Sequence, residues 1–445
     1  MGIKIGSTII NGIKIHNEGA GGNDADSIIS REISGSYTNS TASKVGGYAF
    51  AGCNSLTSVN FTSCTSIGYS AFQFCQSLTT ASFPACSIIS SSAFYRCSVL
   101  SSISFPVCSY IGAAAFNFCS MLTTAIFPSC TCIDYSAFYS CYSLSSISFP
   151  VCTTIGSSAF ASCSLITTAD FPSCTRIYFG AFDRCISLSS ISFPLCSSVD
   201  DLAFYSCSLT NVYFPSCLYI GGQNAFGYCQ SLTTASFPVC TSLGSTAFAN
   251  CHSLVNISFP AATFVGSYAF ESCWALTSVE FPACKSIYSY AFSHCSALTT
   301  VNFPSCWYIG GYAFAYCSLL ANISFPECKG IGSSAFYYCS SSLTVADFPN
   351  CSYVSTNAFY YCLSLTTVSL PSCTSIGSSA FLHCHSLESV YLLNSSTCTL
   401  GSYAFSSTPM LLSSYLGHFG SIYVPSSLVS LYKVMANWKA VSSRI

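Results

Sequence analysis

The hydrophobic positions of this chain recur with a dominant period of 22 residues. Residues 229–250, CQSLTTASFPVCTSLGSTAFAN, show one unit of the repeat. A fixed period of about 20–50 residues indicates a solenoid, in which each unit buries its apolar face against its neighbours. The dipeptide Ala-Phe marks the period at steps of 22, and near the end of 23, 22 and 24, with its phenylalanine at Phe50, Phe72, Phe94, Phe116, Phe138, Phe160, Phe182, Phe204, Phe226, Phe248, Phe270, Phe292, Phe314, Phe336, Phe359, Phe381 and Phe405.

Inside each unit, apolar and polar residues alternate as they do in a short strand. Val59 and Phe61 are expected to point inward, while Ser58 and Asn60 face solvent, because successive strand residues point to opposite faces. In most units a proline follows this phenylalanine and ends the strand, since it lacks a backbone N–H. An Ile-Gly pair then turns the chain, and Ala-Phe is expected to anchor a short helical turn on the core. The string L-x-x-V-x-F-P-x-C is the strand pattern of a leucine-rich repeat.

These features predict a leucine-rich-repeat solenoid of about 16–17 rungs. A parallel β-sheet forms one face, and short turns or helical segments form the other. Because the phase never breaks from Phe50 to Phe336, we expect one solenoid over 46–407, after an N-terminal segment and cap at 1–45. A C-terminal cap is expected at 408–445.

A helix is expected within that C-terminal cap. Four apolar residues in 425–445 follow a serine at helical spacing, which indicates a Ser-capped helix that covers the last rung. These residues are Leu428, Leu431, Met435 and Trp438.

A second period of 44 residues overlies the first. The inward position before each strand phenylalanine alternates small and large, through Ala81, Ile103, Ala125, Ile147, Ala169 and Ile191. Packing of small against large side chains between rungs would explain this. A 44-residue duplication explains it better, because the surface Ser and Thr choices alternate in step.

The 32 cysteines fall into two columns, one three residues after each Ala-Phe phenylalanine and one after Phe-Pro. Only Cys132 and Cys398 lie outside them. Free cysteine packs as a small hydrophobe, and Ala262 at one column position keeps the volume without a bond. We therefore expect buried thiols, with extensive disulfides as the alternative. A metal array is a third possibility, but its best candidate, His383-Cys384-His385, reads more simply as turn residues around a core thiol.

Charge is scarce, at 6% of residues with a net charge of -2. That excludes the basic surface that nucleic-acid binding needs and the polybasic segment that anionic membranes attract. The sequence holds no apolar run of about 18 residues, so no membrane insertion is expected. The first residues do not form a signal peptide.

No arrangement of residues indicates catalysis. The carboxylates are scattered, Asp200-Asp201 is read as a turn variation, and the six histidines show no triad spacing. No phosphate-binding glycine loop occurs. We therefore expect a protein that is not an enzyme and that holds no metal and no cofactor.

The positions that vary between rungs are the candidate binding surface. The two residues after each Ala-Phe vary most, and tyrosines there form a predicted stripe over three rungs, Tyr316, Tyr338 and Tyr361. Tyrosine among Ser and Asn is typical of adaptable recognition surfaces, although stacking that only stabilises the turn would give the same pattern. The candidate binding residues are Tyr316, Tyr337, Tyr338, Tyr360, Tyr361, Tyr213 and Glu280.

The string IGYSAFQFCQSLTTA at 67–81 resembles the BspA-like leucine-rich-repeat family, and the resemblance covers about 45–400. It implies adhesion or binding of host proteins or other cells, and it brings no catalytic residues. Both ends of the chain are similar to those of repeat proteins from gut bacteria and their phages. The chain departs from the family in its high cysteine content and in lacking a signal peptide and wall anchor.

The sequence therefore favours a non-enzymatic adhesion protein that presents a repeat surface to a protein or glycan ligand. An extracellular, cell-surface or virion location fits this function best. The alternative is a structural spacer or fibre component that associates with other copies of itself.

Overall fold

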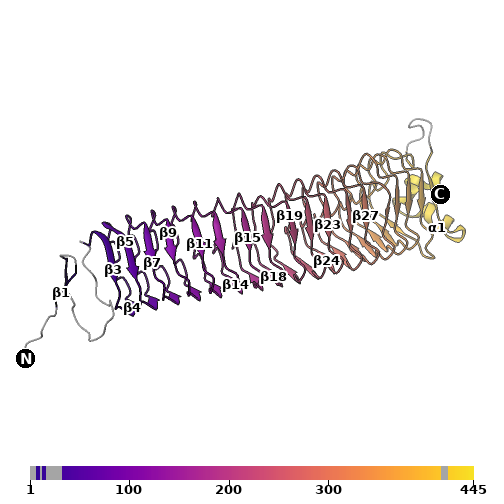
Figure 1. Cartoon of the computed structure of the whole chain (residues 1–445). Helices are drawn as coiled ribbons and strands as arrows, with labels where there is room; N and C mark the ends of the chain where they lie inside the picture. Colours follow the sequence, from indigo (N-terminus) through magenta and orange to yellow (C-terminus); the bar gives the residue numbers. More distant parts are fainter. Residues whose placement is uncertain (1–6, 11–12, 17–32, 412–418) are drawn as a thin grey trace, which may run out of the picture. The chain divides into compact units, whose positions relative to one another are not determined.

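The computed structural model describes residues 7–10, 13–16, 33–411 and 419–445. The chain is a parallel β-solenoid of about 17 turns with a spacing of about 22 residues, which confirms the predicted leucine-rich-repeat architecture (Figure 1). It forms two compact units, Met1–Phe214 and Pro215–Ile445. The domain limits at 46 and 407 stay a prediction.

Each turn of the first unit contributes two short strands. Parallel neighbours pair residue by residue at the period of the repeat, as Ala81 does with Ile103. The first strands of the turns are β3 Gly35–Asn39, β5 Leu56–Phe61, β7 Thr80–Ser82, β9 Ser102–Ser104, β11 Thr124–Ile126, β13 Ser146–Ser148, β15 Thr168–Asp170, β17 Ser190–Ser192 and β19 Asn211–Tyr213. The second strands are β4 Lys44–Val45, β6 Ser66–Ile67, β8 Ile88–Ile89, β10 Tyr110–Ile111, β12 Cys132–Ile133, β14 Thr154–Ile155, β16 Arg176–Ile177 and β18 Ser198–Val199. Before them, β1 Ser7–Ile10 pairs with β2 Ile13–His16 in antiparallel fashion.

The second unit repeats this arrangement. Its first strands are β21 Thr234–Ser236, β23 Asn256–Ser258, β25 Ser278–Glu280, β27 Thr300–Asn302, β29 Ile323–Ser324, β31 Val345–Asp347, β33 Thr367–Ser369, β35 Ser389–Tyr391 and β37 Ser421–Tyr423. Its second strands are β20 Tyr219–Ile220, β22 Ser242–Leu243, β24 Phe264–Val265, β26 Ser286–Ile287, β28 Tyr308–Ile309, β30 Gly330–Ile331, β32 Tyr353–Val354, β34 Ser375–Ile376 and β36 Thr399–Leu400.

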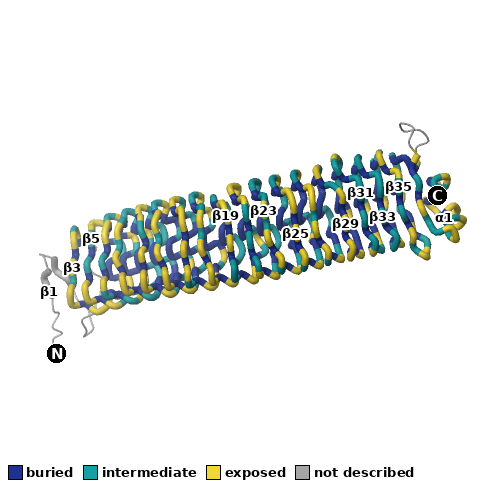
Figure 2. The backbone as a smooth tube through the Cα atoms, turned by 45° about the vertical axis from the view of Figure 1, so that its right-hand side comes forward, coloured by how far each residue is buried: buried dark blue, intermediate teal, exposed yellow. Residues whose placement is uncertain are grey.

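Two columns of phenylalanine fill the core of each unit. Within a column the rings stack, as Phe138 and Phe160 do with centroids 5.2 Å apart. Between columns they meet edge to face, as Phe138 and Phe149 do at 6.0 Å. Aromatic pairs prefer both geometries. Figure 2 shows the buried backbone recurring turn after turn, which is the inward and outward alternation predicted from the sequence.

The residues of the small-large alternation differ in how deeply they are buried. Ala81, Ala125 and Ala169 are buried, but their partners in register, Ile103, Ile147 and Ile191, are only half-buried. Ile323 in the same column is buried, so the isoleucines at this position differ in exposure from rung to rung.

The turn segment, residues 46–53 and their equivalents in later rungs, is not the short helical turn that was predicted. Every second N–H points to the next rung: Tyr48 donates to the Tyr69 carbonyl at 3.0 Å and Phe50 to the Ala71 carbonyl at 2.7 Å. The N–H groups between them close turns inside the rung, as Ala51 does with Tyr48 at 3.0 Å. This alternation needs a left-handed residue two places before and two places after each Ala-Phe phenylalanine. Within the described residues, 32 non-glycine residues at these positions have positive φ, together with Gly52 and Gly180.

The left-handed column two residues before the phenylalanine makes a matched pair of substitutions available. An L-residue in this conformation is about 1–2 kcal/mol less stable than in the right-handed one, whereas glycine tolerates it. We expect Gly180→Ala (φ 60) to lower the free energy of unfolding by about 1 kcal/mol, and Ala114→Gly (φ 53) to raise it by a similar amount. Urea denaturation measures both. Shifts of the same sign in the two variants would contradict this explanation.

Both cysteine columns are packed as free thiols, as predicted. In the first column the thiols donate to the carbonyl of the phenylalanine one rung earlier, as Cys97 Sγ does to Phe72 at 3.0 Å. In the second column it donates to a carbonyl two residues ahead, as Cys108 Sγ does to Tyr110 at 3.3 Å. Burial raises the pKa of Cys108 to about 12, so this thiol stays protonated and unreactive at neutral pH.

The C-terminal cap differs in detail from the predicted Ser-capped helix. A 3₁₀ turn at Ser426–Leu428 leads into α1 Val429–Val434, and a second 3₁₀ segment spans Trp438–Arg444. Neither the 3₁₀ turn nor α1 has a side-chain cap.

The buried face of the cap also differs from the prediction. Of the four predicted residues, Trp438 is buried, Leu428 and Met435 are half-buried, and Leu431 is exposed; Tyr432, which was not among them, is buried as well. The Cys398 N–H donates to the Tyr432 hydroxyl at 2.8 Å, and Trp438 Nε1–H donates to the Cys398 carbonyl at 2.7 Å. Tyr432 and Trp438 thus fasten the cap to the backbone just before β36.

Candidate functional site

Five of the seven predicted binding residues lie together on the turn segments of the second unit. Tyr316 stacks on Tyr338 with ring centroids 5.6 Å apart, and Tyr338 stacks on Tyr361 at 4.4 Å. Beside them, Tyr337 stacks on Tyr360 at 5.0 Å. Tyr337 and Tyr338 join the two rows with centroids 4.7 Å apart.

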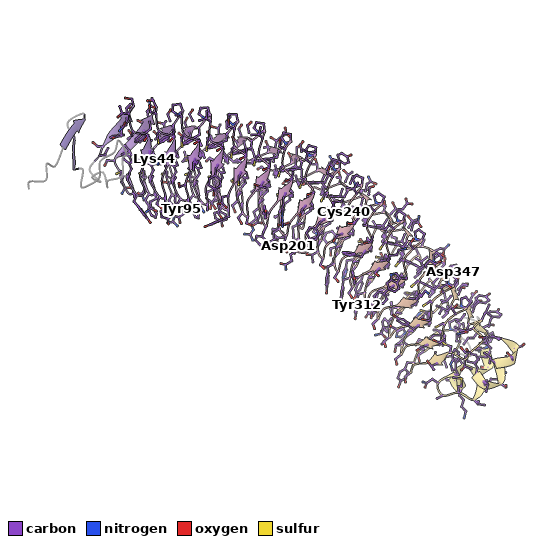
Figure 3. The ribbon with its side chains drawn as sticks, turned by 90° about the horizontal axis from the view of Figure 1, so that it is seen from below. Lys44, Tyr95, Asp201, Cys240, Tyr312 and Asp347 are labelled. Atoms are coloured by element: carbon purple, nitrogen blue, oxygen red, sulfur yellow. The ribbon has the colours of Figure 1, made fainter. Side chains whose placement is uncertain are left out.

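The aromatic surface extends further than the sequence predicted. Tyr268, Tyr290 and Tyr312 stack at 4.6 and 4.7 Å, and Tyr312 meets Tyr337 at 6.1 Å; Tyr312 is labelled in Figure 3. In the other row His294 stacks on Tyr316 at 4.4 Å, while His383 lies edge-on to Tyr361 at 5.6 Å. We call this set the aromatic surface: Tyr268, Tyr290, Tyr312, Tyr337, Tyr360, His294, Tyr316, Tyr338, Tyr361, His383 and His385.

The backbone holds one row of this surface in place. Tyr316, Tyr338 and Tyr361 have φ of 62°, 59° and 63°, in the left-handed region that is unfavourable for a tyrosine. Contacts between neighbouring rings offset part of that cost. The rings are therefore ordered before any ligand arrives, which lowers the entropy lost on binding.

The rings remain accessible and hold hydrogen-bonding capacity. Tyr316 is 39% exposed, and Tyr337, Tyr338, Tyr360 and Tyr361 are half-buried. Within the described residues, none of these five hydroxyls donates to another protein group. Partial burial, followed by the neighbouring tyrosines, raises the pKa of Tyr337, so its hydroxyl stays a donor at neutral pH.

The other two predicted residues do not join the aromatic surface. Tyr213 ends β19 in the first unit and is 63% exposed. Glu280 ends β25, on the strand side of its rung, where its Oε1 accepts a hydrogen bond from Asn302 Nδ2 at 3.2 Å.

The polar residues do not assemble a catalytic group. Asp200 accepts from Arg176 at 3.3 Å as an ion pair, and Asp134 accepts from the Tyr110 hydroxyl at 2.7 Å. Over the part of the chain that the structure describes, no cluster of three or more His, Cys, Asp or Glu could hold a metal ion. His383 and His385 have ring centroids 5.6 Å apart, and burial followed by His383 lowers the pKa of His385. Among the described helices, none has the length and apolar character that crossing a membrane requires.

Comparison with known families identifies the repeat. The sequence profile of the BspA type leucine rich repeat region matches residues 32–145, 109–233, 153–273, 220–344 and 307–423. The chain belongs to this family. Repeat proteins of this kind stack each unit against its neighbours, which agrees with the two stacked phenylalanine columns of the core.

Solved structures of bacterial repeat proteins are similar to this BspA type chain. A leucine-rich repeat protein from Bacteroides ovatus ATCC 8483 is 21% identical, covers 90% of this chain and 98% of its own, and has a TM-score of 0.57. A leucine rich cell surface protein from Faecalibacterium prausnitzii A2-165 is 24% identical over 80% of this chain and 86% of its own, with a TM-score of 0.34. None of the curated proteins matches this chain. The first of these structures supports the fold.

Proposed function

We propose that this BspA type repeat protein is a non-enzymatic recognition protein and that its aromatic surface binds a ligand at a cell or virion surface. The ligand class that the fold favours is another protein, with a glycan as the second ligand class. The observation that carries the proposal is the run of ordered, half-exposed tyrosines whose hydroxyls have no partner among the described residues.

The chemistry of the surface supports protein recognition. Tyrosine brings a large apolar area with few rotatable bonds and one polar end, and it is enriched where proteins bind one another. Lysine, which is depleted at such interfaces, does not occur in the aromatic surface. Rings fixed by their neighbours lose little side-chain entropy on binding.

Substitution of the row formed by Tyr316, Tyr338 and Tyr361 tests the proposal. Wild-type protein is applied to immobilised panels of purified cell-surface proteins and of glycans, and affinity for each bound member is measured by surface plasmon resonance. We expect the triple variant Tyr316→Ala, Tyr338→Ala, Tyr361→Ala to lose at least about 30-fold in affinity, because buried aromatic anchors contribute about 2 kcal/mol or more.

Two controls separate binding from stability. Tyr338→Phe keeps the ring stack and removes the hydroxyl, so it should fold as wild type and lose a smaller part of the affinity. Tyr95→Ala removes a turn-segment tyrosine in the first unit and should leave binding unchanged. A Tyr-to-Ala triple variant that is less stable but binds every panel member as wild type would leave the rings with a structural role only.

Self-association into a spacer or fibre is the second proposed function. A chain in which only 6% of the residues are charged, with a net charge of -2, has few surface charges to keep copies apart. Light scattering with and without reductant distinguishes the cases. A monomer near 47.2 kDa in both conditions favours a foreign ligand, and a defined oligomer or fibre favours self-association.

A further inference from the structure

A second surface of the second unit departs from the repeat in a way that neither the fold nor the aromatic surface explains. The residue after the Phe-Pro column cysteine, or at the equivalent position, is Ser or Thr in most rungs, and its hydroxyl donates to the carbonyl of the same position one rung earlier. Leu218 is a single exception at the start of the second unit. We call this column the hydroxyl ladder. In the second unit its donors are Thr241, Thr263, Ser352, Thr374 and Thr399.

Three consecutive rungs of the hydroxyl ladder hold Lys285, Trp307 and Lys329 instead. The backbone ladder continues through them without a break: Trp307 N–H donates to the Lys285 carbonyl at 2.9 Å, and Lys329 N–H donates to the Trp307 carbonyl at 2.8 Å. The rungs have therefore given up three hydroxyl bonds while keeping the fold. Among the described residues the three side chains form no hydrogen bond that replaces the lost ones, so the fold does not account for their presence.

These three residues line one shallow depression together with Ser305 and Glu327, with a volume of about 520 Å³. Trp307 is 53% exposed, and both lysines and Glu327 are exposed. In the described parts of the chain neither lysine forms an ion pair, and neither ammonium lies over the indole ring. The ring face and the two positive charges are thus available at the same time.

We propose that Lys285, Trp307 and Lys329 form a binding site for an acidic glycan, a chain of sugars that carry carboxylate or sulfate groups. The flat indole receives the apolar face of a sugar ring. The lysines flank it one rung away on each side, at about 4.8 Å per rung, so they meet acidic groups about one disaccharide apart. Ammonium groups bind such anions as point charges.

Glu327 favours a glycan over a nucleic acid. Its carboxylate repels the anionic groups of either ligand, but a glycan also carries many hydroxyls that can donate hydrogen bonds to it. The lining residues carry two positive charges and one negative charge, which suits a polyhydroxylated, moderately acidic chain. The site is separate from the aromatic surface, because it lies in the column before the second strand of each rung rather than on the turn segments.

The test uses the whole chain and two defined probes, a heparin-derived hexasaccharide and a hexamer of uronic acid, with a neutral hexasaccharide for comparison. Calorimetry at physiological salt should show binding of at least one acidic probe, at least tenfold tighter than the neutral one. Trp307→Thr and the double variant Lys285→Thr, Lys329→Thr should each weaken it at least tenfold. These substitutions restore the repeat's own residue and its hydroxyl bond, so the fold is kept.

Matched variants show whether the acidic probe binds at Lys285, Trp307 and Lys329 or at the aromatic surface. Lys285→Arg with Lys329→Arg should retain most of the affinity, and the Tyr-to-Ala triple variant of the aromatic surface should bind the acidic hexasaccharide as wild type does. Absence of binding to both acidic probes would overturn the proposal, as would binding that Trp307→Thr leaves intact. Tighter binding to single-stranded DNA of equal charge would assign the site to nucleic acid instead.

Discussion

In reducing buffer the folded chain is expected to unfold cooperatively between about pH 9 and 11, at a temperature where it is stable at pH 7. The cause is the buried thiols. Burial raises the pKa of Cys240 to about 11 and that of Cys196 to about 12, and it raises the pKa of fully buried Cys163 and Cys251 well above the ordinary 9.0.

The sign of the effect follows from proton binding. Below the pKa of an unfolded thiol, about 8.5, both states hold the proton and the thiol has no pH-dependent effect. Above it the unfolded chain releases protons that the folded chain keeps, so each such thiol lowers the free energy of unfolding by about 1.4 kcal/mol per pH unit. Ten of them acting together remove about 14 kcal/mol over one unit, comparable to the whole stability of an ordinary domain.

The pH dependence of urea unfolding, followed by circular dichroism, measures this proton release. Exposed tyrosines titrate in the same range but nearly equally in both states, so they contribute little to the slope. Cys240→Ala with Cys284→Ala serves as the matched variant, because Ala262 already occupies the rung between them. Its slope above pH 9 should be smaller by about 2.7 kcal/mol per pH unit. An unchanged slope would show that these thiols do not remain protonated in the folded state.

The core was predictable because the same pattern of apolar and polar residues recurs every 22 residues. Val59 and Phe61 alternate with polar residues, so their inward direction follows from strand geometry alone. The packing of the cysteines as free thiols was predictable from side-chain volume, since Ala262 can replace a thiol in a packed core but cannot replace a disulfide partner.

The turn segment could not be predicted from residue types. Its left-handed positions are filled by residues of many types, Ser, Tyr, Phe, Arg, Leu, Ala, Thr, His and Asn, and Gly52 and Gly180 are the glycines among them. The stabilising bonds run to the next rung, as from Phe50 to Ala71, and no local pattern reports them. The stacked repeats enforce this conformation over local propensity.

The same geometry explains why only part of the aromatic surface was predicted. Tyr316, Tyr338 and Tyr361 share one sequence column, and a period is enough to align them. Tyr312 lies two residues before its phenylalanine and Tyr337 one residue after its own, so their contact depends on how the turn folds back. Lys285, Trp307 and Lys329 also share one column, and comparing each column with its own consensus would have revealed them.

Removal of one core ring is expected to have the largest effect of any single substitution in the first unit. Phe138 stacks on Phe116 and Phe160, both at 5.2 Å, and meets Phe127 and Phe149 edge-on, both at 6.0 Å. Phe138→Ala should lower the free energy of unfolding by about 5 kcal/mol, because a buried Phe-to-Ala change costs about 3–5 kcal/mol and ring pairs contribute about 0.5–1.5 kcal/mol each.

Phe138→Leu separates ring contacts from volume. Leu370 and Leu392 occupy phenylalanine positions of the neighbouring column and are fully buried, so leucine fits this core, and its cost should stay near 1–2 kcal/mol. Because stability in a solenoid depends on the interfaces between neighbours, the Ala variant should also broaden the thermal transition, as rungs on either side of 138 unfold separately. Calorimetry of both variants measures the loss in the free energy of unfolding and the width of the thermal transition. Equal losses for Ala and Leu would mean that stacking of the rings, and not the volume they fill, holds adjacent rungs together.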